Sequence, residues 1–85
     1  MSEYKAAFAA GSQVRVAPRS TLEDFMRTWH FHNKLRPEQL EYANHVRRVA
    51  SVGYYHGGDP LYVLEGLPEF VWHEKCLAPA EGMSQ

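Results

Sequence analysis

Near the start of the chain, alternating polar and apolar residues predict a strand. Residues 13–17 (Gln-Val-Arg-Val-Ala) alternate as a strand with one buried face does. Pro18 ends this strand, because proline donates no hydrogen bond to a sheet. The Ala-rich residues 1–11 are expected to form a flexible N-terminal arm, with a short docking strand as the alternative, and the folded domain is predicted to begin at residue 12.

A helix is predicted after the first strand. Apolar side chains from Leu22 to Trp29 recur at i, i+3, i+4 and i+7, which gives a helix one apolar face. Ser20 and Glu23 have the spacing of a capping box, in which each side chain accepts a hydrogen bond from the backbone N–H of the other residue. We therefore expect the helix to begin at Ser20 and to fade at residues 32–34.

A second, short helix is predicted to begin at Pro37. Proline suits the first position of a helix because a backbone N–H has no partner there. Leu40 is expected to face inward, and Asn44 is expected to end the helix. Together the two helices define a helical insert, residues 20–44, after the first strand.

From residue 46 onwards the pattern is that of strands. Residues 46–65 predict a hairpin, whose turn is the sequence His-Gly-Gly-Asp-Pro at residues 56–60. A second turn at residues 66–68 leads to a further strand at residues 70–72. We expect Trp72 of that strand to be buried in the core.

The end of the domain is predicted to be a helical turn at residues 73–76 and an edge strand at residues 77–79, followed by a frayed tail, residues 80–85. A small sheet with short connections removes its exposed edges by closing on itself. The predicted fold class is therefore mainly β: a small SH3-like barrel, residues 12–79, with a two-helix insert after the first strand.

Length and composition restrict the chain to one small domain. Its 85 residues are 45% hydrophobic, which suffices for a core, and no apolar run is long enough to span a membrane. Residues 1–48 hold eight Lys/Arg and five Asp/Glu, a charge of +3, whereas residues 49–85 hold one and five, a charge of −4. This distribution falls short of the basic footprint of a nucleic-acid binder. With one cysteine and no signal-peptide pattern, the chain is expected to be cytoplasmic.

Several short segments resemble the SH3-like domain of nitrile hydratase beta subunits, a barrel shared with electron transport accessory proteins. Residues 11–16 (Gly-Ser-Gln-Val-Arg-Val) resemble its opening strand, and residues 32–37 (His-Asn-Lys-Leu-Arg-Pro) with Tyr42 resemble its His-x-Arg-x-Pro-x-Tyr segment, with extra residues inserted. The segments similar to its hairpin are residues 49–52, the Gly57-Gly58 turn and residues 61–63. The resemblance implies the barrel fold for residues 11–77.

The same resemblance implies an alternative function, in which the chain is a beta-like subunit that completes a metal hydratase active site in a partner chain. In the family, the arginine of the His-x-Arg segment contacts the metal centre of the alpha subunit. The nearest matches here are Lys34 and Arg36, and lysine cannot reproduce the planar two-point contact of arginine. Where the family has an Arg-Gly pair, this chain has Asn44-His45. The Cys-x-x-Cys-Ser-Cys metal-binding segment belongs to the partner subunit and does not occur here.

Five histidines is a high count for 85 residues, and two pairs are candidates for metal ligation. They are His30 with His32, and His73 with Cys76. On a helix, however, positions i and i+2 point apart, and the paired Cys-x-x-Cys spacing of a structural zinc site is missing. We therefore expect no metal and no other cofactor, and histidines that are solvated or hydrogen-bonded.

Cys76 is a candidate nucleophile, with His73 or His45 as its base. A small buried thiol is the commoner role for a cysteine in such surroundings, and no nucleophile motif such as Gly-x-Ser-x-Gly occurs. We expect no enzyme activity from this chain on its own.

The predicted function is that of a non-catalytic accessory or protein-binding module that docks on a larger partner protein. Contact is expected on residues 29–45 of the helical insert and on the adjoining hairpin tip, because a barrel does not need the insert to close. Cationic and aromatic side chains gather there, as they do in recognition surfaces. The alternative is that the insert only caps one end of the barrel. The predicted partner-binding residues are Trp29, His30, His32, Lys34, Arg36, His45, Tyr55 and His56.

Overall fold

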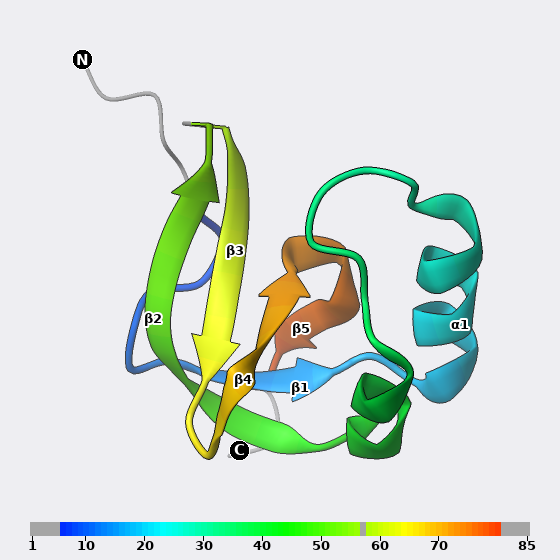
Figure 1. The fold of residues 1–85 in the computed structure, drawn as a ribbon. Coiled ribbons are helices and arrows are strands. Elements are labelled where there is room, and N and C mark those ends of the chain that lie inside the picture. Colours follow the sequence, from blue (N-terminus) through cyan, green and yellow to red (C-terminus); the bar gives the residue numbers. More distant parts are fainter. Residues whose placement is uncertain (1–5, 57, 81–85) are drawn as a thin grey trace.

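The computed structural model describes residues 6–56 and 58–80, and it is built mainly of strands (Figure 1). In chain order the elements are β1 (Gln13–Val16), α1 (Arg19–Thr28), the 3₁₀ helix η1 (Pro37–Tyr42), β2 (Val46–Tyr55), β3 (Asp59–Leu64), β4 (Leu67–His73), the 3₁₀ turn η2 (Glu74–Cys76) and β5 (Leu77–Pro79). We call residues 17–45, which hold α1 and η1, the β1–β2 connection. The predicted mainly β class is confirmed.

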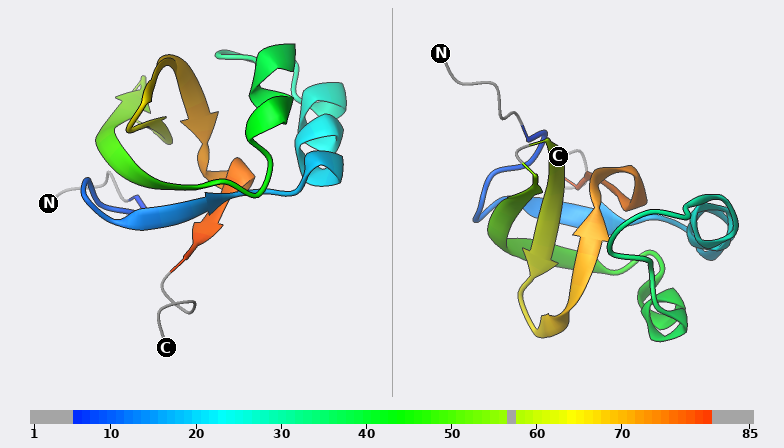
Figure 2. Two further views of the ribbon diagram at one scale, coloured as in Figure 1. Left: turned by 90° about the horizontal axis from the view of Figure 1, so that it is seen from below. Right: turned by 45° about the horizontal axis from the view of Figure 1, so that its top comes forward.

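All five strands form one antiparallel sheet in the order β4-β3-β2-β1-β5. The long strand β2 joins its two halves. Its first residues pair with β1 and the rest pair with β3. In the pairing with β3 the register shifts between Val49 and Ser51, where β2 has one residue more than β3. Such an extra residue lets a strand bend. In Figure 2 the curved β2 folds the sheet over on itself. No ladder joins β4 to β5 among the described residues, so the predicted closure into a barrel is not seen.

The core lies on the inner face of this bent sheet. Alternate residues of β1 and β3 point inward, as the period of two requires, and they include Val14, Val16, Tyr62 and Leu64. Trp72 of β4 lies opposite Tyr62 and is fully buried, so its predicted place in the core is confirmed. These apolar side chains supply most of the stability of so small a domain, because burial of apolar surface is the main favourable term in folding.

Both ends of the described chain contact this core. Phe8, within the segment expected to be an arm, is buried, and its backbone N–H donates to Tyr62 Oη at 3.3 Å. The N–H of Gly11 donates to the carbonyl of Val49 at 2.8 Å. Ala80, expected in the frayed tail, is also buried. The remainder of the expected arm and tail, residues 1–5 and 81–85, and Gly57 of the predicted turn lie outside the described residues.

Helix α1 begins and ends earlier than its sequence pattern predicts. It starts at Arg19, because the carbonyl of Pro18 already accepts hydrogen bonds from Thr21 and Leu22. The predicted cap at Ser20 is therefore wrong: Ser20 lies inside the helix, and no side chain caps it. The helix ends at Thr28 rather than at residues 32–34, because Trp29 has an extended backbone.

Glu23, the other half of the predicted capping box, instead pairs with a neighbour on the helix surface. Its Oε2 lies 2.9 Å from Arg19 Nε, one helical turn earlier. Both side chains are more than half exposed, so this pair contributes little to stability.

The 3₁₀ helix η1 begins at Pro37, as predicted, and Asn44 follows it with a φ of 67°. Asparagine tolerates this left-handed conformation better than most residues, so Asn44 can end the helix as expected. In Figure 2 η1 lies beside α1 at one flank of the sheet.

The β1–β2 connection covers the outer edge of β4 with side-chain hydrogen bonds. Gln39 Nε2 donates to the carbonyl of Val71 at 3.2 Å, and Arg36 Nη1 donates to that of Glu69 at 3.2 Å. An uncovered edge strand invites pairing with another chain, and these donors occupy its carbonyls. The sheet thus protects this edge by covering it rather than by closing. Among the described residues, no helix has the length and apolar character needed to cross a membrane.

Candidate functional site

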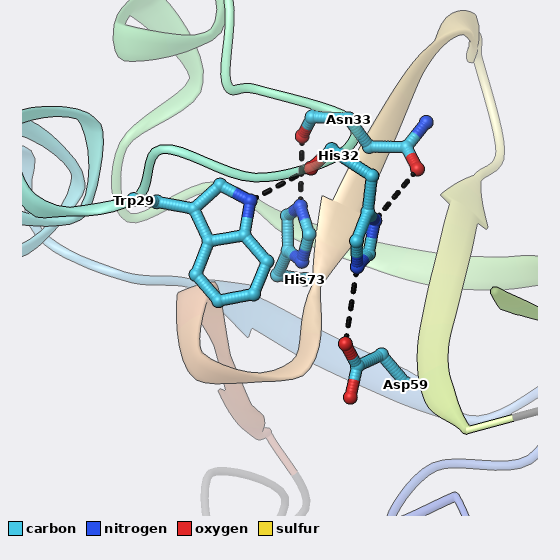
Figure 3. Close-up of polar contacts among 5 residues, drawn as sticks. All are labelled: Trp29, His32, Asn33, Asp59 and His73. Atoms are coloured by element: carbon cyan, nitrogen blue, oxygen red, sulfur yellow. Dashed lines mark hydrogen bonds and ion pairs between the residues drawn. The ribbon is translucent and has the colours of Figure 1, made fainter. Parts of the chain in front are cut away.

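Residues from three separate parts of the chain meet between the end of α1 and the β2–β3 turn (Figure 3). Trp29 follows α1, and its indole Nε1–H donates to the carbonyl of His32 at 2.7 Å. This bond turns the chain back on itself after the helix. Asn33 then adopts a left-handed φ of 50°, and its carbonyl accepts a 2.8 Å hydrogen bond from His73 Nε2, at the end of β4. The loop after α1 is therefore attached to the sheet at His73.

His32 lies at the centre of this group and is held on three sides. Its Nε2 donates to Asp59 Oδ2 at 3.0 Å, and its Nδ1 lies 3.0 Å from Asn33 Oδ1. Its ring stacks on that of Tyr55, with centroids 3.6 Å apart and planes 10° from parallel. The β2–β3 turn, which carries Tyr55 and Asp59, is thereby joined to the loop after α1.

His73 is buried under two aromatic rings. The centroids of Phe25 and Trp29 each lie 4.9 Å from its own. Burial lowers the pKa of His73 below the ordinary value of an imidazole, because the charged form loses its hydration, and the nearby His32 acts in the same direction. The ring is thus held neutral, with its Nε2 proton donated to Asn33.

Two hollows open on this cluster, of about 400 Å³ and about 430 Å³. Both have Trp29 and Asp59 in their walls. We call the pair of hollows the Trp29–Asp59 groove. The first is also lined by Phe25, Pro60, His73, Glu74 and Lys75, and the second by Phe31, His32, Tyr55, His56 and Gly58.

The structure brings together half of the predicted partner-binding residues. Trp29, His32, Tyr55 and His56 all line the second hollow, although the chain separates the first two from the last two by more than twenty positions. Among the described residues, His30 makes no ring contact or hydrogen bond with this group, and Lys34 is exposed.

Arg36 and His45, which were expected on the same surface, lie elsewhere. Arg36 is held over the ring of Phe70, 5.3 Å from its centroid, and His45 packs edge-on against Tyr42 at 5.4 Å. Both therefore lie at the η1 end of the molecule, and the length of β2 separates them from the hairpin tip in Figure 1. The predicted residues therefore lie on two separate surfaces, because the β1–β2 connection runs along the edge of β4 from the end of α1 to η1 instead of folding into one cap.

Several residues of the groove were missed by sequence reasoning. Phe25 was assigned only to the apolar face of the helix, and Asp59 and Pro60 only to a turn. Asp59 lies 27 positions from His32, and no local pattern connects the two. The one sequence signal for Asp59 was its place in the predicted turn that follows Tyr54, Tyr55 and His56.

The candidate chemistry of Cys76 and the histidines is not supported by the geometry. Cys76 is fully buried, and burial raises the pKa of its thiol to about 12, so it is not a nucleophile at neutral pH. The predicted buried thiol is confirmed. Within residues 6–56 and 58–80, no three His, Cys, Asp or Glu side chains are grouped so that they could hold a metal ion. The pairs His30 with His32 and His73 with Cys76 thus form no such group there.

Comparison of the chain with protein-family models, with curated proteins and with solved structures gave no match.

Proposed function

We propose that this chain is a non-catalytic protein-binding module that docks on a larger partner protein through the Trp29–Asp59 groove. The observation that carries the proposal is the exposure of large aromatic side chains beside the groove. Phe31 is 66% exposed and Tyr55 is 39% exposed, and both line the second hollow. Aromatic side chains beside a concave surface are typical of the anchors of protein interfaces.

We further propose that the domain is a partly open barrel of SH3-like type with a helical insert. Three features support this fold. The strand order places β1 between β2 and β5, β2 bends so that it belongs to both halves of the sheet, and the 3₁₀ turn η2 connects β4 to β5. Helices α1 and η1 then form the insert in the first connection. Such a scaffold holds the loop after α1 and the β2–β3 turn, which line the groove, at the ends of its strands, and this suits recognition without chemistry.

A capture experiment tests the docking proposal. The protein is immobilised, exposed to lysate of the cells that produce it, and the bound proteins are identified for the wild type and for two variants, Phe31→Ala and Tyr55→Ala. Val46→Ala is the matched control, since Val46 is also 39% exposed and lies at the opposite end of β2 from Tyr55. A partner that the wild type and Val46→Ala retain, and that both aromatic variants lose at unchanged melting temperature, supports the proposal.

The proposal is wrong if the folded aromatic variants retain the same partner at the wild-type level. In that case the contact lies on another surface, and the η1 end with Arg36 and His45 becomes the next to be tested.

The alternative, a beta-like subunit that completes a nitrile hydratase-type metal site in a partner, rests on the resemblance of short sequence segments. It would require Arg36 or Lys34 to reach the partner's metal centre. Arg36 donates to the carbonyl of Glu69 and lies over Phe70, so it would have to leave both. Co-purification with a metal-binding subunit that carries a Cys-x-x-Cys-Ser-Cys segment, together with hydratase activity of the complex, would favour this alternative.

A further inference from the structure

Trp29 and Asp59 place an aromatic face and a carboxylate in the shared wall of the two hollows. The Asp59 side chain is 60% exposed, and its Oδ2 accepts the hydrogen bond from His32. Among the described residues no hydrogen bond to its Oδ1 is seen. One carboxylate oxygen therefore remains for a ligand at the point where the hollows meet.

The rings around the second hollow stand at large angles to one another. The plane of Trp29 makes an angle of 77° with that of Phe31 and 88° with that of His32. These are edge-to-face contacts, with centroids 5.0 Å and 5.4 Å apart, and Tyr55 stacks on His32, so the wall of this hollow is a packed group of aromatic rings. A cation is attracted to the face of an aromatic ring, so such a wall favours a cationic ligand.

The first hollow continues this chemistry. Phe25 stacks on Trp29, with centroids 5.2 Å apart and planes 15° from parallel, and both residues line this hollow. Glu74 lies in the wall beside Asp59 and is partly buried. Among the described residues, Lys75 is the single Lys or Arg in the wall of either hollow. It is exposed and also lines a neighbouring hollow with Asp24. The walls of the two hollows therefore hold two carboxylates and one ammonium group, and the Glu74 carboxylate also accepts a hydrogen bond from the Tyr62 hydroxyl at 3.4 Å.

We propose that the Trp29–Asp59 groove binds an arginine side chain presented by a segment of the protein partner. Its guanidinium would pack against the partly exposed ring of Trp29 and donate to Asp59. Arginine fits better than lysine because it is planar, stacks on aromatic rings and offers several N–H donors in one plane. A basic partner segment also suits the two carboxylates, those of Asp59 and Glu74, in the walls of the groove. This inference rests on the proposed docking function and names the group that the groove recognises.

Tryptophan fluorescence of the whole protein provides the test, because its two tryptophans differ. Trp72 is buried, whereas Trp29 lines the groove, so a ligand in the groove changes the emission of Trp29. The probe is a five-residue glycine peptide with arginine at its centre. The controls are the same peptide with citrulline, which is neutral and of nearly equal shape, and with lysine.

We expect the arginine peptide to give a saturable change with a dissociation constant on the order of 1 mM, as suits a single side chain. The citrulline peptide should bind about tenfold more weakly, and the lysine peptide more weakly than arginine. Asp59→Asn should weaken arginine binding about tenfold. Glu65→Gln is the matched control, because Glu65 is 57% exposed but lies at the β3–β4 turn, outside the groove; it should leave binding unchanged.

Each other result overturns part or all of the inference. Equal binding of the citrulline and arginine peptides, which needs no variant to measure, would show that the groove does not select a cation. Equal binding of lysine would overturn the choice of arginine. If no peptide binds while Phe31→Ala and Tyr55→Ala still lose the captured partner, the arginine site is wrong and the docking function stands.

Discussion

Trp72 and Gln39 are buried to the same degree, 0% and 1% exposed, but they are held in place by different forces. Trp72 lies in the sheet interior among apolar side chains, and even its indole N–H has no hydrogen-bond partner among the described residues. Gln39 lies in the β1–β2 connection, and both ends of its amide are bonded: Oε1 accepts from the N–H of Arg36 at 2.8 Å, and Nε2 donates to the carbonyl of Val71 at 3.2 Å.

This difference separates the scaffold from the region that carries the candidate site. The sheet interior depends on apolar area, which tolerates changes that keep volume and shape. The β1–β2 connection depends on a few polar side chains that each bond a distant backbone group, Arg36, Gln39 and His73 among them. Loss of Gln39 or His73 leaves a partly buried polar partner without a hydrogen bond. Substitution of these polar side chains should therefore lower the stability of the connection.

The largest effect is expected in the sheet interior. Trp72→Ala removes a fully buried indole and should lower the free energy of unfolding by about 3–5 kcal/mol, close to the whole stability of a domain of this size. Trp72→Phe should lower the free energy of unfolding by less, because it keeps an aromatic ring and removes an N–H that has no hydrogen-bond partner among the described residues. Urea denaturation followed by circular dichroism measures both. A Trp72→Ala protein that melts cooperatively near the wild-type midpoint would contradict the burial of this residue.

In the connection, Gln39→Ala should lower the free energy of unfolding by about 1–3 kcal/mol, because the N–H of Arg36 and the carbonyl of Val71 both lose their partner. Glu38→Ala is the matched control on the same turn of η1: Glu38 is exposed, and its loss should change stability by less than about 0.5 kcal/mol. Equal effects of the two substitutions in urea denaturation would show that the amide of Gln39 does not hold the connection to β4.

A smaller effect should appear in the dependence of stability on pH. Burial lowers the pKa of His73 in the folded protein below its ordinary value of 6.5. Well above pH 6.5 the ring is neutral in both the folded and the unfolded state, and the full stability is present. As the pH falls below that value the unfolded chain takes up a proton first, so stability falls until the lower folded-state pKa is reached.

The measurement is the urea midpoint of the wild type and of His73→Gln between about pH 7.5 and about pH 5. The wild type should lose more stability over this range than the variant, which carries no imidazole at this position. Parallel curves for the two proteins would exclude His73 as the source of the dependence.

The smallest effect on stability is expected at the rim of the groove. Phe31→Ala removes a side chain that is mostly exposed, so the free energy of unfolding should change by less than about 0.5 kcal/mol even though the residue is large and aromatic. A loss of several kcal/mol would mean that Phe31 packs as part of the fold rather than standing free for a partner.

The local features of this fold could be predicted from the sequence. The alternation in β1, the β2–β3 hairpin, Pro37 at the start of η1 and the buried Trp72 all follow from backbone preferences or from periodicity over a few residues. The sequence also predicted that aromatic and histidine side chains would form the candidate site. The two ends of α1 were predicted wrongly. The extended backbones of Pro18 and Trp29 set these ends, and the pattern of apolar residues carries no information on backbone angles.

Only the tertiary structure decided which of these residues meet. His32 bonds Asp59 across 27 positions, Gln39 bonds Val71 across 32, and His73 bonds Asn33 across 40. Such pairs form because the bend in β2 and the path of the β1–β2 connection bring distant segments together. A single sequence carries no periodic signal for contacts of this kind, since they depend on the summed geometry of the whole sheet rather than on the preferences of neighbouring residues.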